Sequence, residues 1–265
     1  MPMHTDAGNP WFWIPQPRRA PRCRLVCFAH AGGPASSFSA LSGSLPTDTE
    51  LWAIQLPGRF ARYREPPPTG LSALVTQIAD ALRSTADPDV PTAVLGQSFG
   101  ALLAAEVARK LERDRPVLAL VLVSACPPHL LVPFPSVSRE QVPDLLLRTD
   151  DSAQEILDCD DLRDVVLDAV WADIELLRQL PDAERLRLRC PVHAIAGTRD
   201  RTIGAAEMRQ WQRYTDRLFT LDELPAPHLI ASAYAAGLSR TLTELLRSDI
   251  ARHRDNDPGR QAEGR

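Results

Sequence analysis

A short glycine-flanked turn between a buried strand and a helix constrains this chain more than any other feature. Residues 92–95 are typical of a covered strand, and residues 101–111 carry alanine and leucine at helical spacing. Between them stands Gly96-Gln97-Ser98-Phe99-Gly100, which matches the pattern G-x-S-x-G. A strand that turns so sharply into a helix needs glycines where the backbones approach, and it presents the serine hydroxyl at the strand end. The sequence therefore predicts a nucleophilic Ser98, the alternative being a capping or turn serine.

Apolar runs and helical segments alternate on both sides of this turn. We expect strands at residues 24–29, 51–56, 92–95, 117–123, 192–196 and 217–224, and helices at 71–82, 101–111, 205–214 and 229–246. Strands that alternate with helices in this order predict an α/β fold, because right-handed crossovers build a mostly parallel central sheet flanked by helices.

The alternation stops between residues 134 and 190. Apolar residues such as Ile156, Val165 and Ile174 recur there at helical spacing, with acidic residues between them and no clear strand pattern. We expect an inserted helical lid within a single domain of residues 1–250, although these helices could instead pack directly on the sheet. Residues 251–265 are polar and predict a disordered tail.

Length and charge exclude several classes of protein. The 265 residues suffice to bury one large core, and a formal net charge of −4 gives no reason to expect binding to nucleic acid or to an anionic membrane. No run approaches the roughly 20 apolar residues that span a bilayer, and the first residues lack the pattern of a secretory signal. We therefore expect a cytoplasmic protein.

The cysteines agree with a reducing compartment. The five are Cys23, Cys27, Cys126, Cys159 and Cys190, which are odd in number and widely spread, so buried reduced thiols are the simpler interpretation. Cys23 and Cys27 have a spacing that metal ligands can have. No second Cys/His pair follows, however, and the alternation around them indicates a strand, so we expect no metal.

A serine nucleophile needs a base within hydrogen-bond distance and a carboxylate that orients the base. At a serine of this kind the order along the chain is serine, acid, histidine. His193 lies inside an expected strand and is interpreted as a packed residue. His228 follows Pro225-Ala226-Pro227 in the loop after the last strand, at the carboxyl edge of the sheet, and is the expected general base.

Asp200 is the expected acid. It follows the strand at 192–196 in a glycine-containing loop at the same edge of the sheet. Asp222 and Glu223, near the end of the last strand, remain alternatives, whereas Asp216 precedes that strand and is expected at the opposite edge. Asp200 could otherwise be only a turn or capping residue.

A tetrahedral intermediate also needs two backbone N–H donors. We expect one from Phe99, directly after Ser98, and the other from Ala31 in the loop His30-Ala31-Gly32-Gly33, although these glycines also fit an ordinary tight turn. Gly32-Gly33 lacks the lysine of a nucleotide-binding loop, and residues 96–100 lack the third glycine of a dinucleotide fingerprint. We therefore expect no cofactor.

Several segments together resemble the type II thioesterases of polyketide and nonribosomal peptide synthases. They are residues 25–33, Gln55-Leu56-Pro57-Gly58-Arg59 with Arg62 and Glu65, residues 96–101, and residues 191–200 with His228. The resemblance runs from Trp11 to about Leu246, and its most specific part is 55–59, since general esterases rarely carry that stretch. It implies an α/β-hydrolase fold and hydrolysis of acyl groups from the phosphopantetheine arm of a carrier protein, through an acyl-enzyme on Ser98.

Three positions depart from the usual pattern of that family. Gln97 stands where the family usually has histidine, Ala226-Pro227-His228-Leu229 stands where Gly-Gly-His-Phe is common, and Ala29 stands where a proline is frequent. None of these changes removes Ser98, Asp200 or His228. All of them flank the expected chemistry, so they bear on the acyl preference.

The resemblance implies acyl or peptidyl carrier proteins as partners, and we expect the enzyme itself to be a monomer. Carrier proteins are typically acidic and this chain is net negative, so docking needs a local basic patch. The candidates are Arg59, Arg62 and Arg64, or Arg18, Arg19, Arg22 and Arg24, most of which could equally be solvated surface arginines. The alternatives to this function are a serine esterase, an acyltransferase or a cyclase acting on a free small molecule, and a non-catalytic interaction module.

Overall fold

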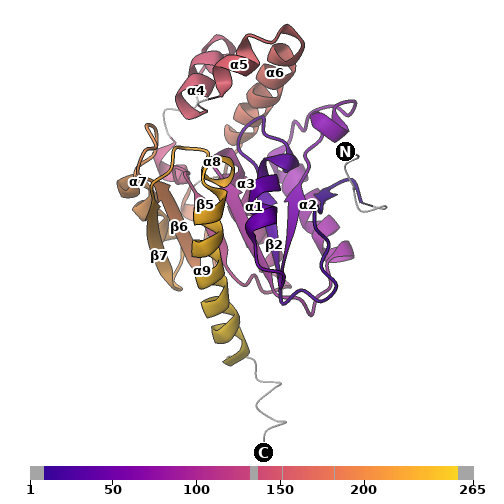
Figure 1. The fold of residues 1–265 in the computed structure, drawn as a ribbon, viewed down its shortest axis with the longest axis vertical. Coiled ribbons are helices and arrows are strands. Elements are labelled where there is room, and N and C mark those ends of the chain that lie inside the picture. Colours follow the sequence, from indigo (N-terminus) through magenta and orange to yellow (C-terminus); the bar gives the residue numbers. More distant parts are fainter. Residues whose placement is uncertain (1–8, 132–136, 151, 182, 256–265) are drawn as a thin grey trace, which may run out of the picture.

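A seven-stranded sheet forms the centre of the computed structural model, which describes residues 9–131, 137–150, 152–181 and 183–255 (Figure 1). The strands are β1 (Phe12–Trp13), β2 (Cys23–Phe28), β3 (Thr49–Ile54), β4 (Thr92–Gln97), β5 (Leu120–Val123), β6 (Val192–Gly197) and β7 (Phe219–Leu224). They lie in the order β1-β3-β2-β4-β5-β6-β7, in which the β1–β3 pair is antiparallel and the other pairs are parallel. The expected α/β fold with a mostly parallel sheet is thus confirmed.

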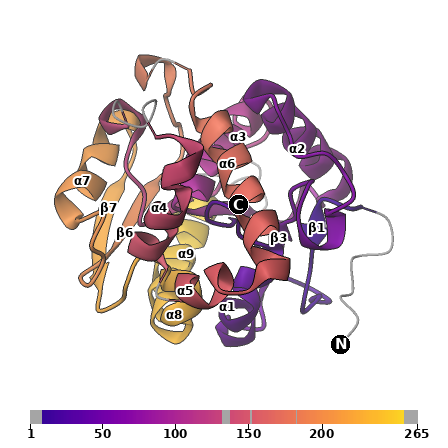
Figure 2. The same ribbon diagram turned by 90° about the horizontal axis from the view of Figure 1, so that it is seen from above.

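Helices cover both faces of the sheet and create two separate cores (Figure 2). One face carries α2 (Leu71–Thr85), α3 (Phe99–Leu111) and α7 (Ala205–Arg209), and the other carries α1 (Ser39–Ser44), α8 (Ile230–Ala233) and α9 (Ala235–Asp255). Because helices lie on both sides, β2 to β6 are buried along their full length, whereas the edge strand β7 is only partly buried.

The loops that carry the expected site meet at one edge of the sheet. Strand β2 ends at Phe28, β4 at Gln97, β6 at Gly197 and β7 at Leu224. Because these strands are parallel, their carboxyl ends lie side by side, and so do the loops that follow them.

In the described part of the segment between β5 and β6, three α-helices lie above this edge (Figure 1). They are α4 (Val142–Thr149), α5 (Ala153–Leu157) and α6 (Asp160–Leu177). Val142, Ala153 and Val170 belong to a small core of their own, while Leu176 near the end of α6 joins the core on the α3 face of the sheet. The end of α6 therefore packs against the main core, whereas α4 and α5 pack in the separate small core. Of the expected segment 134–190, residues 134–136, 151 and 182 lie outside the described ones.

The end of the chain differs from its prediction. Residues 229–246 contain two helices, α8 and α9, separated at Tyr234, and α9 continues to Asp255. The expected disordered tail is therefore wrong for residues 251–255, while 256–265 lie outside the described residues. The physical reason is a buried contact, in which His193 Nε2 on β6 lies 2.8 Å from Asp249 Oδ2. His193 is thus a packed histidine, as expected, and it fastens the polar half of α9 to the sheet.

Smaller differences concern element boundaries. The expected helix at 205–214 is α7 followed by a 3₁₀ helix over Gln210–Tyr214, and the expected strand at 117–123 begins only at Leu120. The Leu118 N–H nevertheless donates to the Thr92 carbonyl at 2.8 Å, so pairing with β4 starts before the strand itself. Among the helices of the described ranges, none is both long and apolar enough to cross a bilayer.

All five cysteines are free thiols. Cys23, Cys27 and Cys190 are buried, as expected, whereas Cys126 and Cys159 are only partly buried. Burial raises the pKa of the Cys23 thiol to about 12, so this thiol is protonated at neutral pH. The buried cysteines therefore act as small apolar side chains in the core.

The turn around Ser98 generates a prediction about stability. A Cβ atom on Gly100 would lie 2.3 Å from the carbonyl oxygens of Phe28 and Ala29, which are backbone atoms with little freedom to move. We expect Gly100→Ala to lower the free energy of unfolding by about 2–4 kcal/mol, measured by urea denaturation.

The matched control for this substitution is Gly43→Ala in α1. Gly43 is exposed, and the nearest atom to its added Cβ, Gln16 Nε2, is 4.0 Å away. We expect this variant to be as stable as the native chain or more stable by up to about 1 kcal/mol, because alanine favours a helix. Equal effects at the two glycines would contradict the steric explanation.

Candidate active site

Ser98 occupies the sharp turn between β4 and α3. Its backbone angles, φ 56° and ψ −123°, lie in a region that residues other than glycine rarely adopt. Its N–H donates to the Val123 carbonyl of β5 at 2.9 Å, which fixes the turn against the sheet. Gly96 and Gly100 leave the space that the turn needs, because a Cβ on Gly96 would lie 2.3 Å from the Gly100 carbonyl oxygen. The sequence thus presents the Ser98 hydroxyl at the strand end by local geometry.

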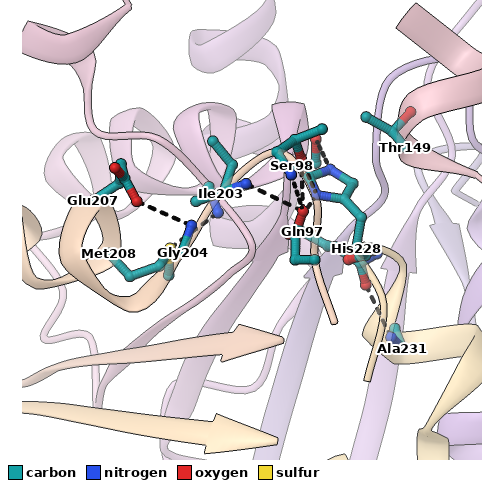
Figure 3. A network of polar contacts seen from close by, with 12 residues as sticks. Gln97, Ser98, Thr149, Ile203, Gly204, Glu207, Met208, His228 and Ala231 are labelled. Carbon is teal, nitrogen blue, oxygen red and sulfur yellow. Dashed lines mark hydrogen bonds and ion pairs between the residues drawn. The ribbon is translucent and has the colours of Figure 1, made fainter. Parts of the chain in front are cut away.

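A continuous chain of polar contacts links Ser98, His228 and Asp200. The Ser98 Oγ lies 3.0 Å from His228 Nε2, and His228 Nδ1 lies 2.7 Å from Asp200 Oδ2. Figure 3 shows the Ser98 side chain directed at the His228 ring. The side chains of His228 and Asp200 are 5% and 0% exposed, so the pair is shielded from water. The structure therefore brings together the residues that the sequence singled out.

The alternative acids lie elsewhere. Asp222 and Glu223 are paired within the sheet to Ile195 and Ala196 of β6. Asp216 precedes β7 and so lies at its amino end. Among the described residues, Asp200 is the carboxylate bonded to His228.

Two opposing effects act on the Asp200 carboxyl. Burial alone would raise its pKa, but hydrogen bonds from His228 and Thr202 stabilise the carboxylate, and the net result is a pKa below the usual value. Oδ1 accepts hydrogen bonds from the Thr202 hydroxyl at 2.7 Å and from the N–H groups of Thr202 and Ile203 at 2.8 and 3.1 Å. The charged carboxylate favours a proton on Nδ1 of His228, which leaves Nε2 able to accept the Ser98 hydrogen.

Two residues that support His228 were not identified from the sequence. The Thr202 Oγ1 lies 3.1 Å from His228 Nδ1, and only its position two residues after Asp200 could have suggested this contact. Gln97 is buried beneath the histidine loop, where its Oε1 accepts from the Ala231 N–H at 3.0 Å and its Nε2 donates to the His228 carbonyl at 3.4 Å (Figure 3). Gln97, noted only as a departure from the family pattern, therefore holds the backbone of His228.

The expected oxyanion donors face the same space as Ser98. Ala31, Phe99 and Ser98 line one cavity, and among the described residues neither the Ala31 nor the Phe99 N–H has a hydrogen-bond acceptor. The next two N–H groups of the loop are occupied, since Gly32 donates to Asp173 Oδ2 at 2.8 Å and Gly33 donates to the His30 carbonyl at 2.9 Å. The geometry thus leaves the Ala31 N–H available to a ligand.

A buried ion pair fixes this loop to the inserted helices. Arg59 donates from Nη1 and Nη2 to the two carboxylate oxygens of Asp173 on α6, both at 2.7 Å. The side chains are 2% and 0% exposed. Asp173 also accepts the Gly32 N–H, so one carboxylate joins α6, the loop after β3 and the loop after β2.

This pair corrects part of the predicted carrier-binding patch. Arg59 is buried and both of its terminal nitrogens are bonded to Asp173, so it is not a surface arginine. Arg24 is 3% exposed and stacks 4.3 Å from the ring centre of Trp52, which removes it from the surface as well. Arg62 is bonded to Glu65 and to the Gln55 carbonyl. Residues 55–59, which carry the family resemblance, thus form buried contacts inside the protein.

A cavity of about 440 Å³ opens beside Ser98. Its walls are largely apolar, and the inserted helices contribute Leu145, Leu146, Val170, Ile174 and Leu177. A cavity of this size and lining suits an apolar chain attached to a reacting group at Ser98. No group of three metal-binding side chains was found among the described residues.

His30 and Ser124 add polarity to this cavity without a sequence signal for their role. Burial lowers the pKa of His30 to about 4, so its ring is neutral at pH 7. Ser124 follows β5 with φ 47°, and its buried Oγ has no hydrogen-bond partner in the described part of the chain. Both residues therefore present neutral polar atoms near Ser98.

Comparisons with known proteins extend over nearly the whole chain. A family model described as "Thioesterase domain" matches residues 23–247. The AMB antimetabolite synthetase AmbE of Pseudomonas aeruginosa is 33% identical over 235 residues, which are 87% of this chain but 11% of AmbE. Thioesterase PikA5 of Streptomyces venezuelae is 32% identical over 238 residues, covering 86% of this chain and 82% of PikA5. The solved structure of the type II thioesterase BorB, from the borrelidin biosynthetic cluster, has a TM-score of 0.77 at 26% identity and covers 93% of this chain and 100% of BorB.

The buried ion pair predicts a large effect on stability. Asp173→Asn leaves the Arg59 guanidinium buried without an anionic partner, so we expect the free energy of unfolding to fall by about 3–5 kcal/mol. Urea denaturation followed by circular dichroism measures this change. The double variant Arg59→Met with Asp173→Leu removes both charges and should regain part of the loss. A double variant no more stable than Asp173→Asn would contradict the assignment of the loss to an unpaired charge.

The low pKa of His30 predicts that stability depends on pH. The folded protein keeps His30 neutral down to about pH 4, while the unfolded chain protonates it near pH 6.5, so protons favour the unfolded state between these values. Relative to His30→Gln, the native chain should lose unfolding free energy as the pH falls through this range, by at most about 1.4 kcal/mol per pH unit. Urea denaturation of both proteins at several pH values tests this, and parallel curves would refute it.

Proposed function

Because this chain belongs to the thioesterase domain family, we propose that it hydrolyses acyl thioesters carried on the phosphopantetheine arms of carrier proteins. The observation that carries this proposal is the hydrogen-bonded chain from Ser98 through His228 to Asp200, which opens onto an apolar cavity. AmbE is named a synthetase, and BorB is a type II thioesterase of a biosynthetic cluster. These relatives support a role in biosynthesis by a synthetase, and the resemblance in residues 55–59 extends the proposal to polyketide or nonribosomal peptide synthases.

The first half-reaction transfers the acyl group to the enzyme. Ser98 Oγ attacks the thioester carbonyl carbon while its proton passes to His228 Nε2, 3.0 Å away. Asp200 accepts a hydrogen bond from Nδ1–H of His228, which orients the ring and stabilises its positive charge. The N–H groups of Ala31 and Phe99 stabilise the oxyanion. The carbon–sulfur bond then breaks, and His228 returns the proton to the leaving thiolate.

The second half-reaction releases the acid. A water molecule gives a proton to His228 Nε2 as its oxygen attacks the acyl carbonyl carbon, and the same two N–H groups stabilise the new oxyanion. The bond to Ser98 Oγ breaks, and the proton moves from His228 to that oxygen. The products are a carboxylic acid and a carrier with a free thiol, so the reaction needs no cofactor beyond the arm of the substrate.

The inserted helices give the proposed enzyme its acyl site. Leu146 of α4 and Ile174 of α6 form part of the cavity wall opposite the sheet, so the helices of segment 134–190 act as a lid over the acyl chain. The apolar side chains of these helices would contact a chain bound there. Hydrolysis by such an enzyme would clear misprimed or stalled acyl groups and return the carrier to use.

Intact mass spectrometry of a panel of acyl-carrier proteins tests this function. The native chain should remove the acyl mass, and Ser98→Ala should leave it in place because the nucleophile is lost. Asp200→Asn should lower kcat by about 10⁴-fold, since the neutral amide no longer holds the histidine in the required tautomer.

Ser124→Ala is the matched control, because it removes another buried hydroxyl from the same cavity without touching the contacts of His228. This variant should remain active on the same carriers. Full activity in Ser98→Ala would refute the nucleophile. A clear preference for a matched simple ester would favour an esterase, and acyl transfer to an added amine or alcohol would favour a transferase.

A further inference from the structure

A second hollow, of about 340 Å³, opens on the other side of His228. Its lining residues are Arg148, Thr149, Arg199, Arg201, Pro227, His228 and Ala233. Arg148, Thr149 and His228 also line the acyl cavity, so the two spaces adjoin at the general base of the proposed mechanism. Figure 3 shows Thr149 at the end of α4, across from the His228 ring. A substrate bonded to Ser98 can therefore extend in two directions, one apolar and one basic.

Two separate segments supply the three arginines of this hollow. Arg148 lies in the last turn of α4, while Arg199 and Arg201 flank Asp200 in the loop after β6. All three are exposed. Arg199 Nη2 donates to the Pro225 carbonyl at 2.8 Å, and no carboxylate in the described ranges forms an ion pair with any of the three. The arrangement therefore concentrates positive charge that the fold itself leaves uncompensated.

Three other arginines in the segment between β5 and β6 are paired with carboxylates. Arg139, Arg163 and Arg178 each form an ion pair, with Asp168, Asp160 and Glu175 respectively. Within the described ranges, no carboxylate forms an ion pair with Arg148.

Two carboxylates lie close to these arginines in the chain, and both are bonded to other groups. Asp150 accepts hydrogen bonds from Ser152 and lines the acyl cavity, while Asp200 is turned toward His228 and Thr202. Arg199 uses one N–H group on the Pro225 carbonyl, and within the described ranges none of the three guanidinium groups has a carboxylate partner, so each can still donate to an anion from solution.

We propose that Arg148, Arg199 and Arg201 bind the phosphodiester of the phosphopantetheine arm, an inference that rests on the proposed function. The acyl chain of a bound thioester lies in the apolar cavity, so its sulfur and the arm beyond it must leave past His228 through the basic hollow. Arginine donates paired hydrogen bonds that match the oxygens of a phosphate. The exposed arginine side chains at the rim bind the phosphate at the far end of the pantetheine chain. The acyl chain itself is uncharged and lies among the apolar residues of the first cavity.

Two substrates that differ only by the phosphate test this assignment. Hydrolysis of the same acyl group is measured from acyl-phosphopantetheine and from acyl-pantetheine, in the native chain and in Arg199→Gln with Arg201→Gln. In the native chain kcat/KM should favour the phosphorylated substrate by about tenfold, mainly through KM, as expected for one charge-assisted hydrogen bond. In the double variant the ratio of the two values should fall to about one, and Arg148→Gln should lower it in part.

Arg240→Gln is the matched control, because it removes the same charge from an exposed position on α9. It should keep the native ratio, and circular dichroism of every variant confirms that it is folded. The ratio makes the test independent of any general loss of rate caused by changing the neighbours of Asp200. A native chain that does not distinguish the two substrates, or a double variant that keeps the native ratio, would overturn the assignment. Failure of the native chain to hydrolyse either substrate or any acyl-carrier protein would instead refute the proposed function.

Discussion

The carboxylate of Asp173 accepts hydrogen bonds from two loops, whose donors lie 141 and 114 residues before it in the chain. It accepts two hydrogen bonds from Arg59 and one from the Gly32 N–H, and it is completely buried. Removing these charges from water costs several kcal/mol for each ion, and only this paired geometry offsets the cost. Helix α6, the loop after β3 and the loop that contains Ala31 are therefore held together by one carboxylate. The same contact holds a wall of the acyl cavity and the backbone that faces the reacting carbonyl.

Much of the fold could be predicted because local patterns decide it. Uninterrupted apolar runs are typical of parallel strands covered on both faces, and their order along the chain determines the sheet. Strand β1 gave no signal, since Phe12 and Trp13 are too few to show a period. The end of α9 depends on Asp249 meeting His193, 56 residues earlier, and a polar helix end held by such a contact looks in sequence like a free tail.

The candidate site likewise contains residues that local patterns predict and residues that depend on distant contacts. Ser98, Asp200 and His228 each follow a strand, so topology alone places them at one edge of the sheet. The burial of Arg59 could not be predicted from its neighbours in the sequence, because arginines are usually exposed and its partner Asp173 stands 114 residues away. Thr202 contacts both Asp200 and His228 through the shape of one loop, which spacing alone does not define.

Gln97 stands directly before the nucleophile and ties down the strand-to-helix connection that contains His228. A primary amide neither gains nor loses a proton in the conditions where proteins stay folded, whereas an imidazole at the same position would change its charge around neutrality. The Gln97 amide that holds the backbone of His228 consequently stays uncharged as the pH changes. A change of pH therefore leaves the two hydrogen bonds between Gln97 and the His228 loop intact.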